Sequence, residues 1–200
     1  MTLVLPSKEL VVYHGTSLSN SIKILKDGFI SSKNEDDWLG WGIYFVTDGL
    51  SSGAMSAFEW AQFKWPNEEL AVVRARIRLT DNGLDLRTRS GLALYNQVKG
   101  ELIRSEYLSL LARRDLSIKK RKDIRCDDRI ITNMVVRYLK CDYIIHNVYI
   151  KDKLQSQIQL ESAYPNQTLV SLYNGNLIYD VEIMPLSFYE SIISEDVEIS

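Results

Sequence analysis

Two segments organise this chain: Val11-Val12-Tyr13-His14-Gly15-Thr16-Ser17 and, about thirty residues later, Gly40-Trp41-Gly42-Ile43-Tyr44-Phe45. Each contains a short run of β-branched and aromatic residues, which is typical of a β-strand, beside small or polar residues. In the first segment a histidine and a glycine stand where the strand is expected to stop. In the second, a tyrosine follows two glycines inside the expected strand. The two segments therefore predict two strands that carry a histidine and a tyrosine at conspicuous positions.

The composition indicates one globular domain. Two hundred residues, 46% of them hydrophobic, are enough for a single domain with a sizeable core and too few for two. No apolar run approaches the length that crosses a bilayer, and residues 1–6 lack the features of a signal peptide. Cys126 and Cys141 are the only cysteines, which excludes a disulfide framework and a zinc-ligand spacing. We therefore expect a single domain at 1-200, cytoplasmic, without a metal and without a membrane partner.

Charge is unevenly distributed along the chain. The net charge of -2 argues against a protein held to nucleic acid by bulk charge alone. Between Arg104 and Arg129, however, nine basic residues accompany five acidic ones, and the run Lys119-Lys120-Arg121-Lys122 lies among them. Residues 190–200 contain only acidic charges. The asymmetry needs a local explanation.

The remaining pattern predicts an α+β domain with mainly antiparallel strands. We expect strands at 10–13, 43–47, 70–79 and 143–149, and a hairpin of 168–173 with 177–184 around Asn174-Gly175-Asn176. We expect helices from Thr16 to Gly28 with Leu18, Ile22 and Leu25 facing inward, from Ser51 or Ser52 to Pro66, over 91–118, and from Asp127 or Asp128 onward. The region at about 91-140 then forms a helical and basic insertion in the domain.

The His-Gly strand and the Gly-Ile-Tyr-Phe strand resemble the first two parts of the signature of the ADP-ribosyltransferase superfamily, in its poly(ADP-ribose)-polymerase-like and diphtheria-toxin-like branch. The third part of that signature is a Glu or Gln at the start of a late strand. Gln167, in Tyr164-Pro165-Asn166-Gln167-Thr168, has this arrangement, and Glu161 is its rival. The resemblance spans about residues 11–173. It implies a split, mainly antiparallel β-sheet with flanking helices that clasps NAD between its two halves, and no metal.

The resemblance also assigns roles in breaking the bond between nicotinamide and ribose. The transition state is oxocarbenium-like, so the site must hold the leaving group, orient the ribose and stabilise positive charge. His14 is expected to hydrogen-bond the ribose, Gly15 to pair its backbone with the nicotinamide amide, and Tyr44 to stack on the ring. Thr16 and Ser52 are further candidates for binding NAD, and Phe58 for a second aromatic wall. Capping explains Ser52 equally well, and core packing explains Phe58.

Gln167 is expected to bond the 2′-hydroxyl of the nicotinamide ribose, and the reading of its side chain as a solvated strand end stays open. A glutamine here departs from the glutamate of chain-elongating polymerases, which makes single-unit transfer the expectation. The resemblance thus implies an NAD-dependent mono-ADP-ribosyltransferase, a pentosyl-transferring glycosyltransferase. Two alternatives remain: a catalytically silent module that recognises NAD, ADP-ribose or RNA, and an RNA 2′-phosphotransferase, whose late arginine we do not place in this chain.

The acceptor is not encoded in the signature. The alternating strand at 70–79 puts Arg74, Arg76 and Arg78 on one face, and that face and the run Lys119-Lys120-Arg121-Lys122 could each follow a phosphate backbone of RNA or DNA. Each could equally be a solvated surface or dock an acidic partner protein. A compact transferase without a secretion signal or targeting domain resembles the toxin of a toxin–antitoxin or phage-defence system, which would make an antitoxin protein a further partner.

Overall fold

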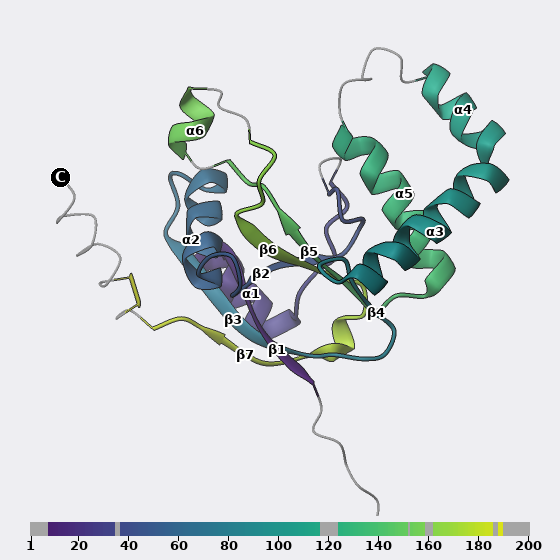
Figure 1. Ribbon diagram of the computed structural model, residues 1–200. Coiled ribbons are helices and arrows are strands. Elements are labelled where there is room, and N and C mark those ends of the chain that lie inside the picture. The colour runs from purple at the N-terminus through teal and green to yellow at the C-terminus, as the bar shows by residue number, and fades with distance from the viewer. Residues whose placement is uncertain are drawn as a thin grey trace, which may run out of the picture.

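The computed structural model describes residues 8–34, 37–116, 124–151, 153–158, 162–185 and 188–189, without the side chains of 113–116, 124–126 and 153–154. Seven strands form one mixed sheet in the order β4-β5-β6-β2-β1-β3-β7 (Figure 1). The strands are β1 (Glu9–Ser17), β2 (Ile43–Thr47), β3 (Leu70–Arg78), β4 (Gly83–Asp85), β5 (Tyr143–Val148), β6 (Gln167–Leu172) and β7 (Ile178–Ile183). The helices are α1 (Leu18–Asp27), α2 (Gly53–Lys64), α3 (Arg89–Ser105), α4 (Tyr107–Leu116), α5 (Ile124–Leu139), α6 (Lys153–Gln157) and the short 3-10 turn η2 (Gly175–Leu177). The α+β class is confirmed, and among these strands only β4 and β5 run parallel.

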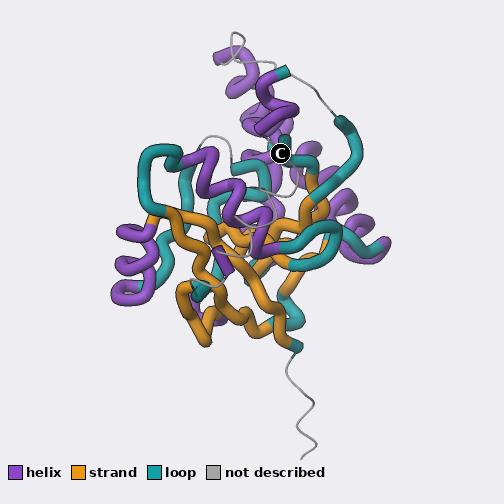
Figure 2. The backbone as a smooth tube through the Cα atoms, turned by 90° about the vertical axis from the view of Figure 1, so that its left-hand side faces the viewer, coloured by secondary structure: helices purple, strands orange, loops and turns teal. Residues whose placement is uncertain are grey.

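The sheet has a core on each face. Alternate residues of the strands supply each core, because successive side chains of a strand point to opposite faces. The first core joins the sheet to α2, α3 and α5 through Ala57, Val98 and Val135, and the second contains Phe45 and packs against Phe29. Figure 1 shows α2 and the group α3–α5 above opposite ends of the sheet, and Figure 2 shows the strands as a twisted layer with helices above and beside it.

Strand β1 extends further than expected from the sequence. It pairs with β3 along its whole length, from Glu9 opposite Arg78 to Ser17 opposite Leu70. His14 and Gly15 therefore lie inside the strand, and the prediction that they end it was wrong. The cause is non-local: β3 supplies backbone partners as far as Ser17, which the local sequence does not indicate.

Helix α1 begins and ends where capping signals place it, but its inward face differs from the prediction. The Ser17 hydroxyl accepts from the Asn20 N–H at 3.4 Å, and Gly28 ends the helix with φ 83°. Ile22 and Leu25 are exposed, and the buried residue is Ser21, whose hydroxyl donates to the Leu18 carbonyl at 2.7 Å. Because α1 follows β1 without an intervening residue, the strand fixes the orientation of the helix. This orientation buries the small Ser21 side chain, whose hydroxyl is hydrogen-bonded within the helix.

The expected hairpin between β6 and β7 does not form. Strand β6 lies inside the sheet with β2 on one side and β5 on the other, so both of its edges are occupied. The chain instead crosses to the opposite edge, where Ile178 of β7 pairs with Ile77 of β3. Asn174 begins this crossover as the cap of η2, and its side-chain amide donates to Asp142 at 2.9 Å. The residues Asn174-Gly175-Asn176 thus form a turn, as predicted, but this turn starts a crossover and not a hairpin.

Most other predicted elements are present. The expected strands at 43–47, 70–79 and 143–149 correspond to β2, β3 and β5, and Ser52 caps α2. The helical stretch at 91–118 is divided between α3 and α4, and α5 begins at Ile124, before the predicted aspartates. The run Lys119-Lys120-Arg121-Lys122 and Glu161 lie outside the described residues.

Gly15 gives a direct test of this packing. A Cβ atom on Gly15 would lie 1.7 Å from the Ala57 carbonyl oxygen, which belongs to the backbone of α2 and cannot move aside alone. We expect Gly15→Ala to lower the free energy of unfolding by about 3 kcal/mol, the upper end of overpacking costs. Chemical denaturation followed by circular dichroism measures the change.

The matched control is Gly100→Ala in α3. A Cβ there would meet the Arg104 guanidinium at an ordinary 3.7 Å. Alanine in a helix interior should then stabilise the protein by about 0.5–1 kcal/mol. Equal stability of Gly15→Ala and the wild type would show that α2 does not press on β1.

Candidate functional site

The sheet is weakly joined between β1 and β2. The register between them consists of Tyr13 opposite Val46, whereas β1 and β3 pair at nine positions. Two side chains bridge the strands on either side of that pair. Thr47 Oγ1 donates to the Val11 carbonyl at 2.7 Å, and His14 Nδ1 lies 2.8 Å from the Tyr44 carbonyl oxygen. The strands β3 and β7 thus extend from β1, and β6, β5 and β4 from β2, as two halves that meet at a single backbone pair.

His14 is fixed in one tautomer by this bridge. A carbonyl oxygen only accepts, so Nδ1 carries the proton and Nε2 of the neutral ring is an acceptor. The rings of Phe29 and Phe45 pack edge-on against the imidazole at 5.5 Å and 5.9 Å between centroids. Burial lowers the pKa of His14, and the bond to the Tyr44 carbonyl opposes this effect. At neutral pH His14 therefore offers Nε2 as a neutral acceptor.

Gly15 and Thr16 follow His14 in β1. The position of Gly15 requires glycine because the backbone of α2 lies directly against its α-carbon. Packing therefore accounts for this glycine, and its expected contact with a ligand stays a prediction. Thr16 is buried and pairs with Ala71 of β3. Neither residue pairs with β2, because the pairing of β1 with β2 ends at Tyr13 and Val46.

Tyr44 has a structural role that the sequence did not indicate. Its hydroxyl donates to the Gly40 carbonyl at 2.8 Å, and its ring packs against the first core. Burial raises the pKa of the phenol, so it remains protonated at neutral pH. Across the β2–β6 pair lies Ser171, whose buried hydroxyl has no hydrogen-bond partner within the described residues. The expected stacking of Tyr44 on nicotinamide stays a prediction.

His14 and Tyr44 belong to opposite faces of the sheet. The His14 ring contacts Phe45 and Phe29, which belong to the second core or pack on it, whereas Tyr44 packs on the first core. The bond from His14 to the Tyr44 backbone lies between the strands. The sheet therefore separates the two side chains.

Gln167 begins β6, as predicted, and pairs with Val148 of β5. The residue is buried, with 8% of its surface exposed. Tyr44 is opposite Ser171, four residues further along β6, which puts Gln167 about 13 Å away along the strand. The structure thus places the two residues on neighbouring strands but at different ends.

Ser52 acts as a helix cap and Phe58 packs against the first core, as the alternatives for these two residues predicted. The Ser52 hydroxyl is exposed and accepts from the Met55 N–H at 3.4 Å as the cap of α2. Phe58 lies 5.6 Å from the ring of Tyr189 and 6.4 Å from that of Phe188, between ring centroids. Tyr189 in turn accepts from the Val72 N–H at 2.8 Å. These contacts attach the end of the described chain to α2 and β3.

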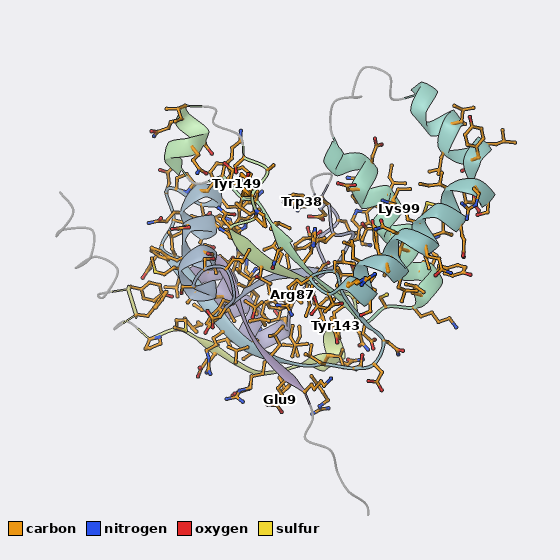
Figure 3. All side chains as sticks on the ribbon, in the orientation of Figure 1. Glu9, Trp38, Arg87, Lys99, Tyr143 and Tyr149 are labelled. Carbon is orange, nitrogen blue, oxygen red and sulfur yellow. The ribbon has the colours of Figure 1, made fainter. Side chains whose placement is uncertain are left out.

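The loop before β2 is held by α5. The side-chain oxygen of Asn133 accepts from the Trp41 N–H at 2.9 Å, and Arg129 donates to the Asn34 carbonyl at 3.1 Å. Tyr173 also donates to the Leu39 carbonyl. Figure 3 shows Trp38 of this loop between α2 and the group α3–α5. The helical segment predicted as an insertion therefore positions the loop that leads to Tyr44.

His146 was missed in the sequence. It is one of two histidines in the chain and lies in β5, opposite Leu169 of β6. Gln167 precedes Leu169 by two residues in β6, so the side chains of His146 and Gln167 lie on the same face of the sheet. Its Nδ1 atom is buried without a hydrogen-bond partner in the described part of the chain. Burial lowers the pKa of His146, while Asp128 and Asp85 oppose this effect. The only available signal was a histidine inside a predicted strand just before the third motif.

Neither of two surface cavities is lined by His14, Tyr44 or Gln167. One, of about 560 Å³, lies between α3, α4 and α5, where Trp41, Arg129 and Asn133 line it. The other, of about 620 Å³, lies beside α2 and β7 and is lined in part by Phe58 and Tyr189.

The predicted arginine face is engaged in ion pairs. Arg74 lies 2.5 Å from Glu182, and Arg76 lies 3.0 Å from Asp180 and 3.4 Å from Glu9. Arg78 stacks over the ring of Tyr179 at 5.5 Å. Carboxylates beside two of the three guanidinium groups reduce the net attraction of this face for a phosphate backbone.

The described residues contain neither a cluster that could hold a metal ion nor a membrane-spanning helix. They contain no group of three or more His, Cys, Asp or Glu side chains that could hold a metal ion. None of their helices is long and apolar enough to cross a membrane.

Comparison with known proteins identifies no family. A scan of family models, a search of curated proteins and a search of solved structures each found no match to this chain.

Removal of the Tyr44 hydroxyl tests its structural role. Tyr44→Phe leaves the buried Gly40 without the phenol that donates to its carbonyl, which should cost about 1–3 kcal/mol of unfolding free energy. Tyr107→Phe is the matched control on the surface of α4, and we expect a change within about 0.5 kcal/mol. Equal effects of the two changes in urea titrations would contradict the role assigned to Tyr44.

The two histidines predict a pH dependence of stability. Both have a lowered pKa in the folded state, whereas in the unfolded chain each titrates near about 6.5. As pH falls from 7.5 to 5.5 the unfolded state takes up more protons, so the free energy of unfolding should decrease. The slope should be smaller in the variant His14→Gln/His146→Gln. An identical slope in wild type and variant would exclude the histidines as its source.

Proposed function

We propose that this chain is an NAD-dependent mono-ADP-ribosyltransferase of the cytoplasm, with NAD as co-substrate and a macromolecular acceptor. The observation that carries the proposal is the adjacency of β1, β2 and β6 in the sheet, with β1 and β2 joined at one backbone pair and bridged by His14. These are the three strands that carry the His-Gly, Gly-Ile-Tyr-Phe and Gln elements. His14 and Gln167 are over one hundred and fifty residues apart in the sequence, yet they lie in β1 and β6, the two strands that flank β2.

The chemistry assigns each side chain a step. The bond between the ribose C1′ and the nicotinamide nitrogen breaks, its electron pair leaves with nicotinamide, and positive charge develops on the ribose. His14 Nε2 accepts a hydrogen bond from a ribose hydroxyl, which its fixed tautomer permits. The backbone of Gly15 holds the nicotinamide amide, and the ring of Tyr44 stacks on the leaving group.

Gln167 supports transfer of a single unit. The residue is buried at the start of β6, and its side-chain amide can hydrogen-bond the ribose 2′-hydroxyl. Unlike a carboxylate, an amide carries no charge to stabilise the oxocarbenium ion or to activate a further ribose hydroxyl. Repeated addition to a growing polymer is accordingly not expected.

The biological setting follows from the same proposal. A small transferase that modifies RNA, DNA or protein in the cytoplasm fits the toxin of a toxin–antitoxin or phage-defence system, with an antitoxin protein as partner. The ion-paired arginine face gives β3 no strong preference for nucleic acid. The acceptor is therefore assigned by experiment: labelled material is digested with nuclease or with protease.

A second candidate is a catalytically silent module that binds NAD, ADP-ribose or RNA. Two observations favour it: the Tyr44 hydroxyl and ring are used inside the protein, and the described cavities lie away from the signature residues. The two candidates differ in one measurable property, the release of nicotinamide.

The test is incubation of the protein with labelled NAD and cell lysate, with nicotinamide release and label transfer both measured. His14→Ala should reduce both by about 100-fold or more, the usual effect of removing one oriented hydrogen-bonding group from a site. Binding of NAD without nicotinamide release by the wild type would support the silent module.

Thr47→Val is the matched control, because Thr47 makes the other side-chain bridge between β1 and β2. It should lower stability by about 1 kcal/mol and leave nicotinamide release close to the wild-type value. If the two variants lose activity equally, His14 acts only by joining the strands.

A further inference from the structure

His146 lies on the same face of the sheet as Gln167, in the neighbouring strand. It is opposite Leu169, and Gln167 is opposite Val148, so the two side chains are diagonal neighbours about 7–8 Å apart. Both are at the end of β6 that is distant from Tyr44. If Gln167 holds the ribose, His146 is positioned beside it on the side of β5.

The imidazole of His146 is not used by the fold. Nδ1 is buried without a hydrogen-bond partner in the described part of the chain. The residue as a whole is half-buried. An unpartnered buried polar atom costs about 1–3 kcal/mol, which a purely structural residue at this position would avoid.

The surroundings keep the ring available as a base. Asp85 and Asp128 influence it from β4 and α5. Arg87 pairs with Asp85 at 2.7 Å, and Lys99 lies near Asp128; Figure 3 labels both cations. Each carboxylate thus has a cation beside it, which limits how far it can hold the imidazole in its charged form.

We propose that His146 is the general base that deprotonates the acceptor, and that the acceptor is a group that is neutral and protonated at pH 7, such as a hydroxyl or a ring N–H. This inference rests on the proposed transferase function. It goes further by assigning the chemical class of the nucleophile.

Attack of the acceptor on the ribose accompanies the loss of nicotinamide. The acceptor oxygen or nitrogen forms a bond to the ribose C1′ as the bond from C1′ to nicotinamide breaks, and the electron pair of that bond leaves with nicotinamide. The acceptor proton passes to a ring nitrogen of His146, which becomes an imidazolium and then releases the proton to water. A carboxylate acceptor has no proton to lose and would not need this residue.

The experiment compares His146→Ala with the wild type in label transfer and in NAD affinity. We expect transfer to fall by about 10²–10⁴-fold with the Kd for NAD unchanged. Added imidazole should restore part of the activity of His146→Ala. In the wild type the rate should rise with pH through the pKa of His146, and this limb should be absent in His146→Gln.

Asn147→Ala is the matched control in the same strand, because Asn147 is on the opposite face, where it accepts from Thr168 at 2.9 Å. It should transfer label at a rate close to that of the wild type and should not respond to imidazole. The product linkage should resist neutral hydroxylamine, which cleaves esters of carboxylate acceptors. Nuclease and protease digestion then show whether the group belongs to nucleic acid or protein.

The outcomes separate the two proposals. Wild-type protein that releases no nicotinamide overturns the transferase and this inference together. Active wild type with unchanged transfer by His146→Ala, or with a linkage that hydroxylamine cleaves, overturns this inference alone.

Discussion

The structure depends on how β1 and β2 are held together. A single backbone pair, Tyr13 with Val46, joins the two halves of the sheet, and the side chains of His14 and Thr47 complete the connection by bonding to backbone carbonyls. A hydrogen bond from a side chain fixes a strand less rigidly than a continuous ladder does, because it constrains one atom and not the whole register. Beyond Tyr13, β1 has no backbone register with β2. The same constraint explains why α2 packs so closely on Gly15: the helix contacts both strands and spans the weak connection.

The sequence was informative where structure is local. Strands β2, β3 and β5, the cap at Ser52 and the stop at Gly28 follow from alternation, capping and glycine conformation, which act within a few residues. It was misleading where partners are distant. The length of β1 is determined by β3, and the destination of β7 is determined by the fact that β6 already has two neighbours. Of the site, the position of Gln167 at the start of a late strand was predicted from the sequence, whereas the adjacency of the strands that carry His14, Tyr44 and Gln167 was not. The internal bond of the Tyr44 hydroxyl and the unpartnered ring of His146 depend on side-chain packing that no local pattern encodes.

The helical segment α3–α5 is connected to the site by more than chain continuity. Asn133 and Arg129 of α5 hold the backbone of the loop before β2, and the same two residues line the cavity between the helices. Tyr44 and Tyr173 fix the other side of this loop through the Gly40 and Leu39 carbonyls. The loop is therefore held between the sheet and α5, so its position depends on the positions of both.

The central position of β6 has a consequence for how the chain acquires its structure during synthesis. β2 and β5 are made well before residues 167–172, yet each needs β6 to complete its hydrogen bonds. Until residues 167–172 have been added, two strand edges remain open, and the contacts that close the edge of β2 span over one hundred residues. Contacts of such long range form slowly, and open edges are prone to pair with other chains. Completion of the sheet, and with it the arrangement of His14, Tyr44 and Gln167, thus waits for the synthesis of residues 167–172.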